Sequence, residues 1–503
     1  MTPSITAARR GVVQRRPRRH VRLVSAVALG AASIATTFVP ALRTDALEWV
    51  PLVLVVPLVL WCAWPVHQAA ACGVVSGRWT PDVLATIGIL AAFAWSVHAL
   101  LSDRAVGHLV PVALATVLMV AAQHVGEEAG VDDPYASSPV WLTPLVLVVA
   151  ASAMAAWWTT DGSGSATSAA LSALLIAGPG ALRLATPAAL LVGTRRGAQA
   201  GILVASRTDL DMSTQVDTVL LDQHGTITTG ALSVVSVDPV DPEHLRNLRW
   251  FAGALERSSD HPIARAIAQG TDAGRVSDVV QRPGLGISGS VDRHPVRVGR
   301  PSWIGIDDPG GLGTRVGVEV DARVLGSITL ADTLRPHAQD DVERLRSLGV
   351  EPFLVSDGPA LDTRDLADRS GIVTSHAEMT VEDRMRLVER LRADGRIVAV
   401  VGDAGRHGAA MQAADLALST GGEVPVTGIV LPDVDVRTVG DALALTRATA
   451  STARANHRWA PAAMLAPLPF AAGGLVDPAY ASAICLLGMI GVALNSLRIP
   501  RMR

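Results

Sequence analysis

The chain has 503 residues, of which 49% are hydrophobic and 18% are charged, and its formal net charge at pH 7 is -3. This charge argues against nucleic acid as the main partner. The three cysteines, Cys62, Cys72 and Cys485, are scattered, so we expect neither a disulfide framework nor a Cys-x-x-Cys metal module. All basic residues other than histidine are arginine, so a mechanism that needs a catalytic lysine ammonium is excluded.

Apolar runs predict eight membrane spans, because a helix needs about 20 apolar residues to cross a bilayer. The basic segment 1–21 precedes them, and the positive-inside rule predicts that it stays in the cytoplasm. Eight crossings return the C-terminus to the same side. We therefore expect an integral protein of a bacterial-type plasma (inner) membrane, with both termini cytoplasmic and the lipid bilayer as a partner. The predicted spans are 22–42, 47–66, 82–101, 106–123, 139–158, 168–192, 457–475 and 478–498.

The polar segment 193–456 alternates strand-like and helix-like runs. Three predicted strands are each followed by an acidic residue: Asp222, Asp357 and Asp403. This pattern is typical of an open parallel sheet that binds its ligand at the carboxyl ends of the strands. The predicted strands are Thr218–Leu221, Pro352–Ser356 and Ile397–Val401, and the predicted helices are Ala338–Leu348, Thr363–Ser370, Glu382–Ala393 and Ala409–Ala414.

A separate region lies between Asp222 and Asp332. It contains short β-like runs such as Val291–Gly299. We interpret it as an insertion into the α/β domain.

Several motifs occur in a specific order and together resemble those of the heavy-metal P-type ATPases, closest in layout to the copper-translocating type. The stretch from Asp222 to Gly230, Asp-Gln-His-Gly-Thr-Ile-Thr-Thr-Gly, is similar to that family's phosphorylation loop. The other motifs are Thr80-Pro-Asp82, Leu184-Ala-Thr-Pro187, Glu256 with Ser259-Asp-His261-Pro262, Gly284-Leu-Gly286-Ile-Ser-Gly289, Asp332-Thr-Leu-Arg335-Pro336 and Val401-Gly402-Asp403 with Ala414-Asp415.

The resemblance implies an α-helical membrane domain of about eight spans and a cytoplasmic α/β domain like that of the haloacid dehalogenases. This phosphorylation domain would comprise 193–231 and 331–456. An inserted α+β nucleotide-binding domain would comprise 232–330, and spans would fill 22–192 and 457–498.

The resemblance also implies ATP and Mg²⁺ as cofactors, with Asp222 as the nucleophile. Catalytic residues would be Asp222, Thr226, Asp357 and Arg384. Mg²⁺ would be held by Asp222, by Asp403 and by the main-chain carbonyl of His224. Nucleotide contacts would come from Glu256, His261, Gly284 and Gly286.

This sequence departs from the family's pattern at the phosphorylation loop and its surroundings. Gln223 stands in place of a lysine, and Arg384 replaces a second catalytic lysine. Val355-Ser356 replaces Thr-Gly, and Arg406-His407 replaces an Asn-Asp pair. Losing one transition-state donor typically costs about 10²–10³ in rate, so these changes predict that turnover is nearly abolished.

The transport site departs as well. Gly178, Pro179 and Gly180 occupy the family's Cys-Pro-Cys position, and glycine offers none of the thiolates that hold Cu(I). Cys485 with Met464 or Met489 would make a poor soft site, and packing is the favoured role for these residues. No transport-metal site is intact.

The family's actuator domain, with its Thr-Gly-Glu motif, is expected between the fourth and fifth spans. Only a short link, about 124–139, lies there, and no Thr-Gly-Glu occurs in the chain.

Three functional hypotheses remain open. The first is a P-type cation-transporting ATPase by descent, with pumping of a heavy-metal cation impaired or lost. The second is a membrane pseudoenzyme that senses nucleotide or acts as a regulatory partner of a complete pump. The third is a residual phosphatase of the haloacid dehalogenase type, in which His224 serves as the acid/base.

Overall fold

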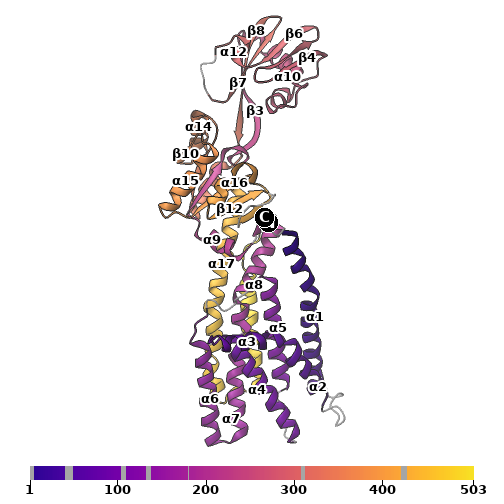
Figure 1. Ribbon diagram of the computed structural model, residues 1–503, viewed down its shortest axis with the longest axis vertical. Coiled ribbons are helices and arrows are strands. Elements are labelled where there is room, and N and C mark those ends of the chain that lie inside the picture. Colours follow the sequence, from indigo (N-terminus) through magenta and orange to yellow (C-terminus); the bar gives the residue numbers. More distant parts are fainter. Residues whose placement is uncertain are drawn as a thin grey trace. The chain divides into compact units, whose positions relative to one another are not determined.

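The computed structural model describes residues 5–39, 49–102, 109–131, 138–178, 180–204, 206–307, 312–420 and 428–502, with the backbone alone for 5–19, 404 and 406. The chain divides into two compact units. A helical unit comprises Met1–Ala198 with Leu445–Arg503, and an α/β unit comprises Gln199–Ala444. Each unit is described separately below (Figure 1).

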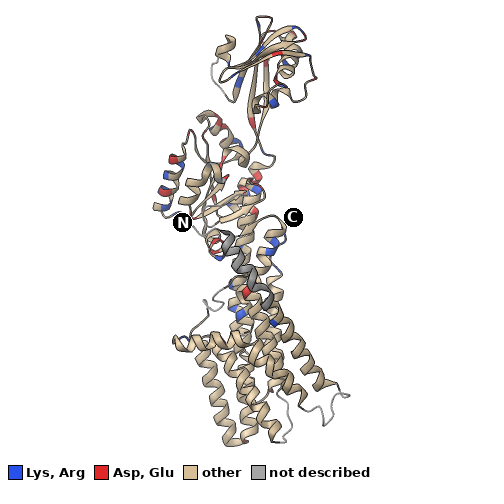
Figure 2. Ribbon diagram, turned by 45° about the vertical axis from the view of Figure 1, so that its right-hand side comes forward, with Lys and Arg blue, Asp and Glu red and all other residues tan. Residues whose placement is uncertain are grey.

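The helical unit consists of long apolar helices that share one core. Figure 2 marks few charged residues along these helices, in contrast to the α/β unit. The helices are α1 (Ile5–Phe38), α2 (Val50–Pro57), the π-helix η3 (Leu58–Cys62), α3 (Trp64–Val75), α4 (Pro81–Leu101), α5 (Leu109–Glu128), α6 (Leu142–Thr160), α7 (Ser163–Ile176), α8 (Gly180–Gln199), α17 (Val436–Leu465), α18 (Leu468–Ala472) and α19 (Pro478–Ser496).

Six described helices are long and apolar enough to cross a membrane, and a bent pair of helices raises the number to as many as seven. The pair is Val50–Cys62 with Trp64–Val75, bent by 51°. The prediction of a continuous span over 457–475 is wrong: α17 ends at Leu465 and α18 begins at Leu468. Pro467 lies between them, and proline removes a backbone donor that a continuing helix requires. Residues 40–42 and 47–48, 106–108 and 179 of the other predicted spans lie outside the described residues.

The α/β unit contains a seven-stranded sheet with the strand order β1-β13-β12-β11-β2-β9-β10. All neighbouring strands are parallel except β1, which is antiparallel to β13. The strands are β1 (Leu203–Val204), β2 (Thr218–Asp222), β9 (Glu351–Val355), β10 (Thr374–His376), β11 (Val398–Gly402), β12 (Leu416–Thr420) and β13 (Gly428–Leu431). The associated helices are α9 (Arg207–Gln215), α13 (Ala338–Ser347), α14 (Ala360–Ser370), α15 (Val381–Ala393) and α16 (Ala404–Ala413).

Both faces of this sheet are buried, because successive strand residues point to opposite sides. Val219 and Leu221 of β2 belong to one apolar core, together with residues of α13 and α14. Leu220 between them belongs to a second core, with residues of α15 and α16. The continuous apolar runs of β2 and β11 follow from this burial on two faces. The α/β class and the three predicted strands are confirmed.

The second sheet has six strands in the order β3-β8-β7-β6-β5-β4, and all its neighbouring pairs are antiparallel. Leu248 and Leu255 of α10 are fully buried in its core. The strands are β3 (Thr228–Pro239), β4 (Val276–Arg282), β5 (Gly286–Val291), β6 (His294–Gly299), β7 (Thr314–Val320) and β8 (Arg323–Leu334). The helices are η5 (Pro242–His244), α10 (Leu245–Glu256), α11 (Pro262–Ala268) and α12 (Pro301–Ile304).

Candidate functional site

Asp222 is the last residue of β2, and β2 lies between β11 and β9 near the middle of the parallel sheet. The tight segment η4 (Gln223–Ile227) follows it and leads into β3. Gly225 provides the turn of this segment, because its φ of 76° lies in the left-handed region that glycine adopts at little cost. β2 and the turn at Gly225 therefore hold a buried carboxylate at the carboxyl edge of the sheet, where such folds bind ligands.

Two basic side chains contact this carboxylate from helices on one face of the sheet. Arg384 of α15 approaches Asp222 with its Nη2 at 3.7 Å from Oδ1. His407 of α16 places Nε2 at 3.2 Å from Oδ2, within ion-pair distance but without hydrogen-bond alignment. Arg384 Nη1 lies 3.1 Å from His407 Nδ1, and all three side chains are buried. The carboxylate thus contacts one guanidinium and one imidazole of its own chain.

These contacts set the protonation of Asp222. Burial alone raises the pKa of its carboxyl, because a charge is poorly solvated there. The adjacent His407 and the charges of Arg384 and His224 act in the opposite direction, and together they hold the pKa of Asp222 below its ordinary value. Asp222 is therefore ionised at neutral pH.

Gln223 is neutral, so it does not supply the Asp222 carboxylate with a charged donor. Its Oε1 accepts a hydrogen bond of 2.5 Å from Ser356 Oγ, and that hydroxyl accepts one of 2.8 Å from the Gly358 amide. Gln223 and Ser356 are both buried. The substitutions at 223 and 356 thus compensate each other structurally: they tie the β2 loop to the β9 loop.

His224 lies on the more open side of the loop, between two acids. Its Nδ1 is 3.2 Å from Asp332 Oδ2, and its Nε2 is 3.6 Å from Asp357 Oδ1. Thr228 Oγ1 donates to the same Asp332 oxygen over 2.6 Å. The hydrogen bond with Asp332 raises the pKa of His224 against the effect of partial burial, and the charges of Asp222 and Asp357 raise it further.

Arg335 holds the loop from its other end. Its Nη2 donates to the Gly225 carbonyl over 2.9 Å, and its Nε donates to the Thr228 carbonyl over 3.1 Å. It also forms an ion pair with Asp433 at 3.2 Å. Sequence reasoning quoted Arg335 only as part of a motif and did not assign it this positioning contact.

Asp403 follows β11 and begins α16 as its N-cap, with Oδ1 accepting a hydrogen bond of 2.8 Å from the Gly405 amide. Its neighbour Gly402 has a φ of 157°, and a Cβ there would lie 2.4 Å from His407 Cδ2. A side chain at 402 would therefore displace the His407 ring from Asp222. The sequence-based prediction treated His407 only as the replacement of an acid. Its spacing of four residues from Asp403, about one helical turn, is the signal that could have indicated its place in the site.

Four buried polar atoms around Asp222 lack a hydrogen-bond partner in the described structure: Asp222 Oδ1, Thr226 Oγ1, Arg384 Nε and His407 Nε2. Asp222, Arg384 and His407 also line one small cavity. Buried polar atoms normally find partners, so unpaired ones mark a place where a ligand or water completes the network. The mixture of a carboxylate, a hydroxyl, a guanidinium and an imidazole is suited to an oxyanion near a carboxylate.

The residues predicted to contact nucleotide belong to the six-stranded sheet and its helices. Glu256 ends α10 and is buried, which raises its pKa to about 7. His261 is exposed and caps α11, where its Nδ1 accepts a hydrogen bond of 3.3 Å from the Ile263 amide. Gly284 lies in the turn before β5, and Gly286 begins β5, where a Cβ would lie 2.2 Å from the Val298 carbonyl oxygen. The end of α10 with Glu256 and the turn with Gly284 both adjoin the six-stranded sheet. His261 has the ordinary role of a helix cap.

In the helical unit, the break between α7 and α8 lies against α19. A Cβ on Gly180 would be 2.6 Å from Met489 Sδ and 3.6 Å from Cys485 Sγ. Cys485 Sγ lies 3.5 Å from the Gly178 carbonyl oxygen. Met464 is buried in the same apolar core, and Pro179 lies outside the described residues. Sulfur atoms of α19 thus pack on the glycines.

A buried ion pair joins Asp82 of α4 to Arg183 of α8, three residues after Gly180. Asp82 is 5% exposed and Arg183 is 8% exposed. Sequence reasoning did not single out Arg183, although a charge within an apolar run is a recognisable signal of function or pairing.

Residues 216–415 match the sequence model of a family described as haloacid dehalogenase-like hydrolase. With the membrane-length helices, this match defines an integral membrane protein that carries a haloacid dehalogenase-like α/β domain. The matched residues begin just before β2, the strand that ends at Asp222, and stop just before β12.

Curated relatives and solved structures narrow this class. "Cation-transporting P-type ATPase B" of Mycobacterium bovis is 37% identical over 380 residues, which is 71% of this chain and 50% of the relative. "Copper-exporting P-type ATPase" of Mycobacterium tuberculosis is 37% identical over 378 residues, 71% of this chain and 49% of the relative. The chain spans about half the length of the curated relatives it matches.

A crystal structure of a zinc-transporting PIB-type ATPase in its E2.Pi state has the same fold, with a TM-score of 0.74 at 19% identity. It covers 96% of this chain and 100% of that chain. The chain belongs to the heavy-metal P-type ATPase family.

Proposed function

We propose that this protein is a heavy-metal P-type ATPase relative in which ATP-driven cation pumping is impaired or lost, while nucleotide binding is retained. One observation carries the proposal: the carboxylate of Asp222 is contacted by Arg384 and His407, both of which are buried. A carboxylate nucleophile must present one oxygen to the transferred phosphoryl group. Here both carboxylate oxygens already face a basic side chain of the same chain: Oδ1 faces Arg384 and Oδ2 faces His407.

The surroundings of the phosphoryl group would also be weaker than in the family. Catalysis of phosphoryl transfer is mainly positioning and charge neutralisation. At 223 the chain offers a neutral amide that is already bonded to Ser356. Arg384 keeps a positive charge but carries a broad planar group in place of a compact ammonium.

The oxygen donors at the sheet edge fit Mg²⁺, which prefers oxygen ligands. Asp222 Oδ1 has no hydrogen-bond partner in the described structure, and Asp403 is exposed at the next strand end. We propose that these carboxylates and the main-chain carbonyl of His224 would hold the ion. Bound Mg²⁺ would neutralise phosphate charge, and the nearby guanidinium of Arg384 would weaken its binding, because like charges repel.

Nucleotide binding is proposed at Glu256, His261, Gly284 and Gly286. The observation that favours it is the buried Glu256 carboxyl, whose pKa of about 7 allows it to donate or accept a hydrogen bond near neutral pH. The catalytic set would be Asp222 with Thr226, Asp357 and Arg384, in a domain formed by 193–231 and 331–456, and the nucleotide domain would be 232–330.

The helical unit supports the loss of transport. Gly178 and Gly180 offer no thiolate, and Cys485 and Met489 pack against them. Residues 129–141 alone separate α5 from α6, where the family carries its actuator domain. We therefore propose a nucleotide-sensing or regulatory role beside a complete pump as the alternative to slow pumping, with the α/β unit and both termini on the cytoplasmic side of the plasma membrane.

Labelling of the full chain in membrane vesicles with ATP carrying a labelled γ-phosphate tests this proposal. The expected result is saturable binding of ATP with Mg²⁺ and no acid-stable label on the protein. Asp222→Asn serves as the control for background label. Strong acid-stable label that Asp222→Asn removes, together with metal-stimulated hydrolysis, would overturn the proposal and establish a working pump.

A second candidate function is a phosphatase, and the His224–Asp332 pair favours it. Asp332 raises the pKa of His224, so the imidazole is protonated to a higher pH and can donate a proton to a leaving group. Full-length protein would then hydrolyse a small aryl phosphate, and His224→Ala would reduce the rate by about 10²–10⁴-fold. Asp332→Asn would move the alkaline limit of activity to lower pH. Equal background rates in wild type and His224→Ala would exclude this candidate.

A further inference from the structure

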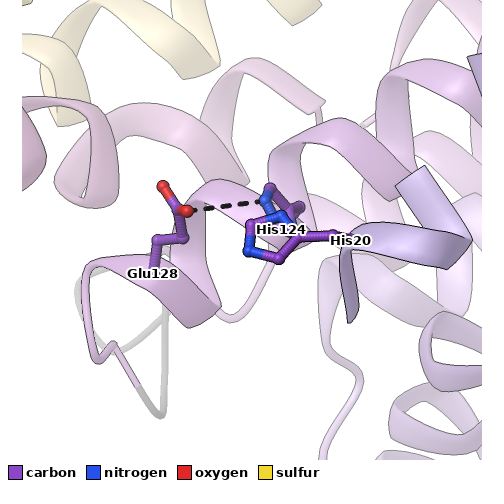
Figure 3. Close-up of side chains that lie close together, drawn as sticks. All are labelled: His20, His124 and Glu128. Carbon is purple, nitrogen blue, oxygen red and sulfur yellow. Dashed lines mark ion pairs between the residues drawn. The ribbon is translucent and has the colours of Figure 1, made fainter. Parts of the chain in front are cut away.

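Three side chains of the helical unit converge outside both regions described above: His20 of α1, and His124 and Glu128 of α5 (Figure 3). One ligand atom from each residue lies within 4.8 Å of the other two. The rings of His20 and His124 meet edge to face with centroids 4.9 Å apart. His124 Nε2 lies 3.7 Å from Glu128 Oε1.

The packing of the two helices creates this cluster. α1 approaches α5 closely at Gly30, where a Cβ would lie 2.5 Å from Val117 Cγ2. His20 precedes Gly30 in α1, and His124 follows Val117 in α5, so the pairs have the order of antiparallel neighbours. His124 and Glu128 are four residues apart and share one face of α5. The end of α5 therefore presents two ligands, and the middle of α1 presents the third.

We propose that His20, His124 and Glu128, here termed the α1–α5 cluster, bind a divalent transition-metal cation of the zinc class. Two imidazole nitrogens and one carboxylate oxygen are a ligand set that suits Zn²⁺, with water in the fourth position. Such a set disfavours Cu(I), which prefers sulfur, and Mg²⁺, which prefers oxygen alone. This inference does not rest on nucleotide or phosphoryl chemistry.

The geometry needs only a modest closure. Ligands bound at about 2.0–2.1 Å to a tetrahedral ion lie roughly 3.3 Å apart. His20 and Glu128 are exposed and His124 is partly exposed, so rotamer changes can bring the ligand atoms together.

The neighbouring charges allow a ligand at Glu128. Arg195 Nη2 contacts Glu128 at Oε2, over 3.4 Å, and leaves Oε1 on the side of His124. Arg195 is largely exposed, so this pair is weak. Gln123 bonds to Glu127 and not to the cluster.

The consequence is a cation-dependent link between the middle of α1 and the end of α5. A metal that binds only the folded helix pair stabilises it in proportion to the logarithm of its concentration over Kd. The predicted orientation of the basic N-terminal segment places this link at the cytoplasmic surface.

Zn²⁺ titration of the tag-free full chain in detergent micelles, in competition with a chromophoric chelator, tests the proposal. We expect one Zn²⁺ per chain and an affinity that falls by at least about tenfold in each of His20→Ala, His124→Ala and Glu128→Gln, since even outer-shell changes cost 10–100-fold. His98 and Cys72 are exposed residues outside the cluster, of types that can bind metals. His98→Ala and Cys72→Ser should therefore retain the wild-type affinity. Millimolar Mg²⁺ should not compete.

Thermal unfolding separates metal binding from structural damage. Zn²⁺ should raise the Tm of the wild type and of His98→Ala but not of Glu128→Gln, whose metal-free Tm should equal that of the wild type because the substitution is isosteric and exposed. Wild-type Zn²⁺ affinity in the three cluster variants, or its loss in Cys72→Ser or His98→Ala, would overturn the proposal. Absence of stoichiometric binding to the wild type would overturn it as well.

Discussion

The Asp222 centre and the α7–α8 break have changed in opposite ways. Around Asp222 four of the replacements are polar side chains with contacts in the site: Arg384 and His407 face the carboxylate, and Gln223 bonds to Ser356. At the break, Gly178 and Gly180 present no side chain, and the sulfur of Met489 packs on the backbone. On the function proposed above, the polar site loses reactivity by gaining partners, whereas the metal site loses it by losing ligands.

The two regions also differ in how they would respond to substitution. A buried charge network is sensitive to the loss of one member, because the remaining charges are left unpaired. An apolar contact made by a flexible thioether can adjust. The following substitutions, ordered by expected effect, break or sharpen this difference.

The largest effect is expected at the Asp82–Arg183 ion pair, next to the break between α7 and α8. Arg183→Ala leaves Asp82 buried near 5% exposure without this partner, and breaking a buried pair in this way costs about 3–5 kcal/mol. Thermal unfolding in detergent should show a large drop in Tm. The double variant Asp82→Asn with Arg183→Gln removes both charges and should be less destabilised than Arg183→Ala; equal losses would show that the charge pairing is unimportant.

At the Asp222 centre, Arg384→Gln should cost about 1.5–3 kcal/mol, because one charged partner of a buried carboxylate is lost while His407 remains. The sign of the pH dependence follows from the lowered pKa of Asp222. Its stabilisation is present above the ordinary pKa of 3.8 and is lost as the pH falls through the still lower folded value.

The stability difference between wild type and Arg384→Gln should therefore shrink below about pH 4. Denaturant unfolding at a series of pH values measures it. A difference that is constant down to pH 2 would contradict the proposed link between Arg384 and Asp222.

Gly402→Ala should cost about 1–3 kcal/mol, because its Cβ would meet the His407 ring and its φ of 157° disfavours a side chain. Gly408→Ala in α16, the helix that carries His407, is the control, since no atom lies within 4 Å of its Cβ position. It should stabilise the protein by about 0.5–1 kcal/mol. Comparable Tm values for the two variants would show that His407 is not held by the backbone of Gly402.

The smallest effect is expected at Gly180→Ala, below about 1 kcal/mol. The Cβ would lie 2.6 Å from Met489 Sδ, but the methionine side chain has three rotatable bonds and can move away. A Tm close to that of the wild type is the expected result. A loss as large as that of Gly402→Ala would mean that the packing at the break is as rigid as the Asp222 network.

Much of the Asp222 site was predictable from the sequence. An apolar run followed by an acid occurs three times, and β9, β2 and β11 are neighbours in the parallel sheet. The acids Asp222, Asp357 and Asp403 therefore lie at one edge, as the pattern predicts. The four predicted helices also occur, with α14 and α16 beginning earlier than expected.

The contacts that decide how the site behaves were not predictable in this way. Arg384 approaches Asp222 from 162 positions later in the chain, and Arg183 pairs with Asp82 across 101 positions. The interruption of the predicted span 457–475 between Leu465 and Leu468 was not predicted, because hydropathy counts apolar residues but does not register where a helix ends.

The sequence by itself determined the class of the protein, because the periodicity of apolar residues and the order of short motifs are local properties that survive substitution. It also determined that the lysines and thiolates of the family are absent. Only the tertiary structure decided what their replacements do: that His407 turns onto Asp222, that Gln223 bonds to Ser356, and that His20 meets His124. Those contacts join distant segments, and their geometry is set by packing between helices and strands, which local pattern does not encode.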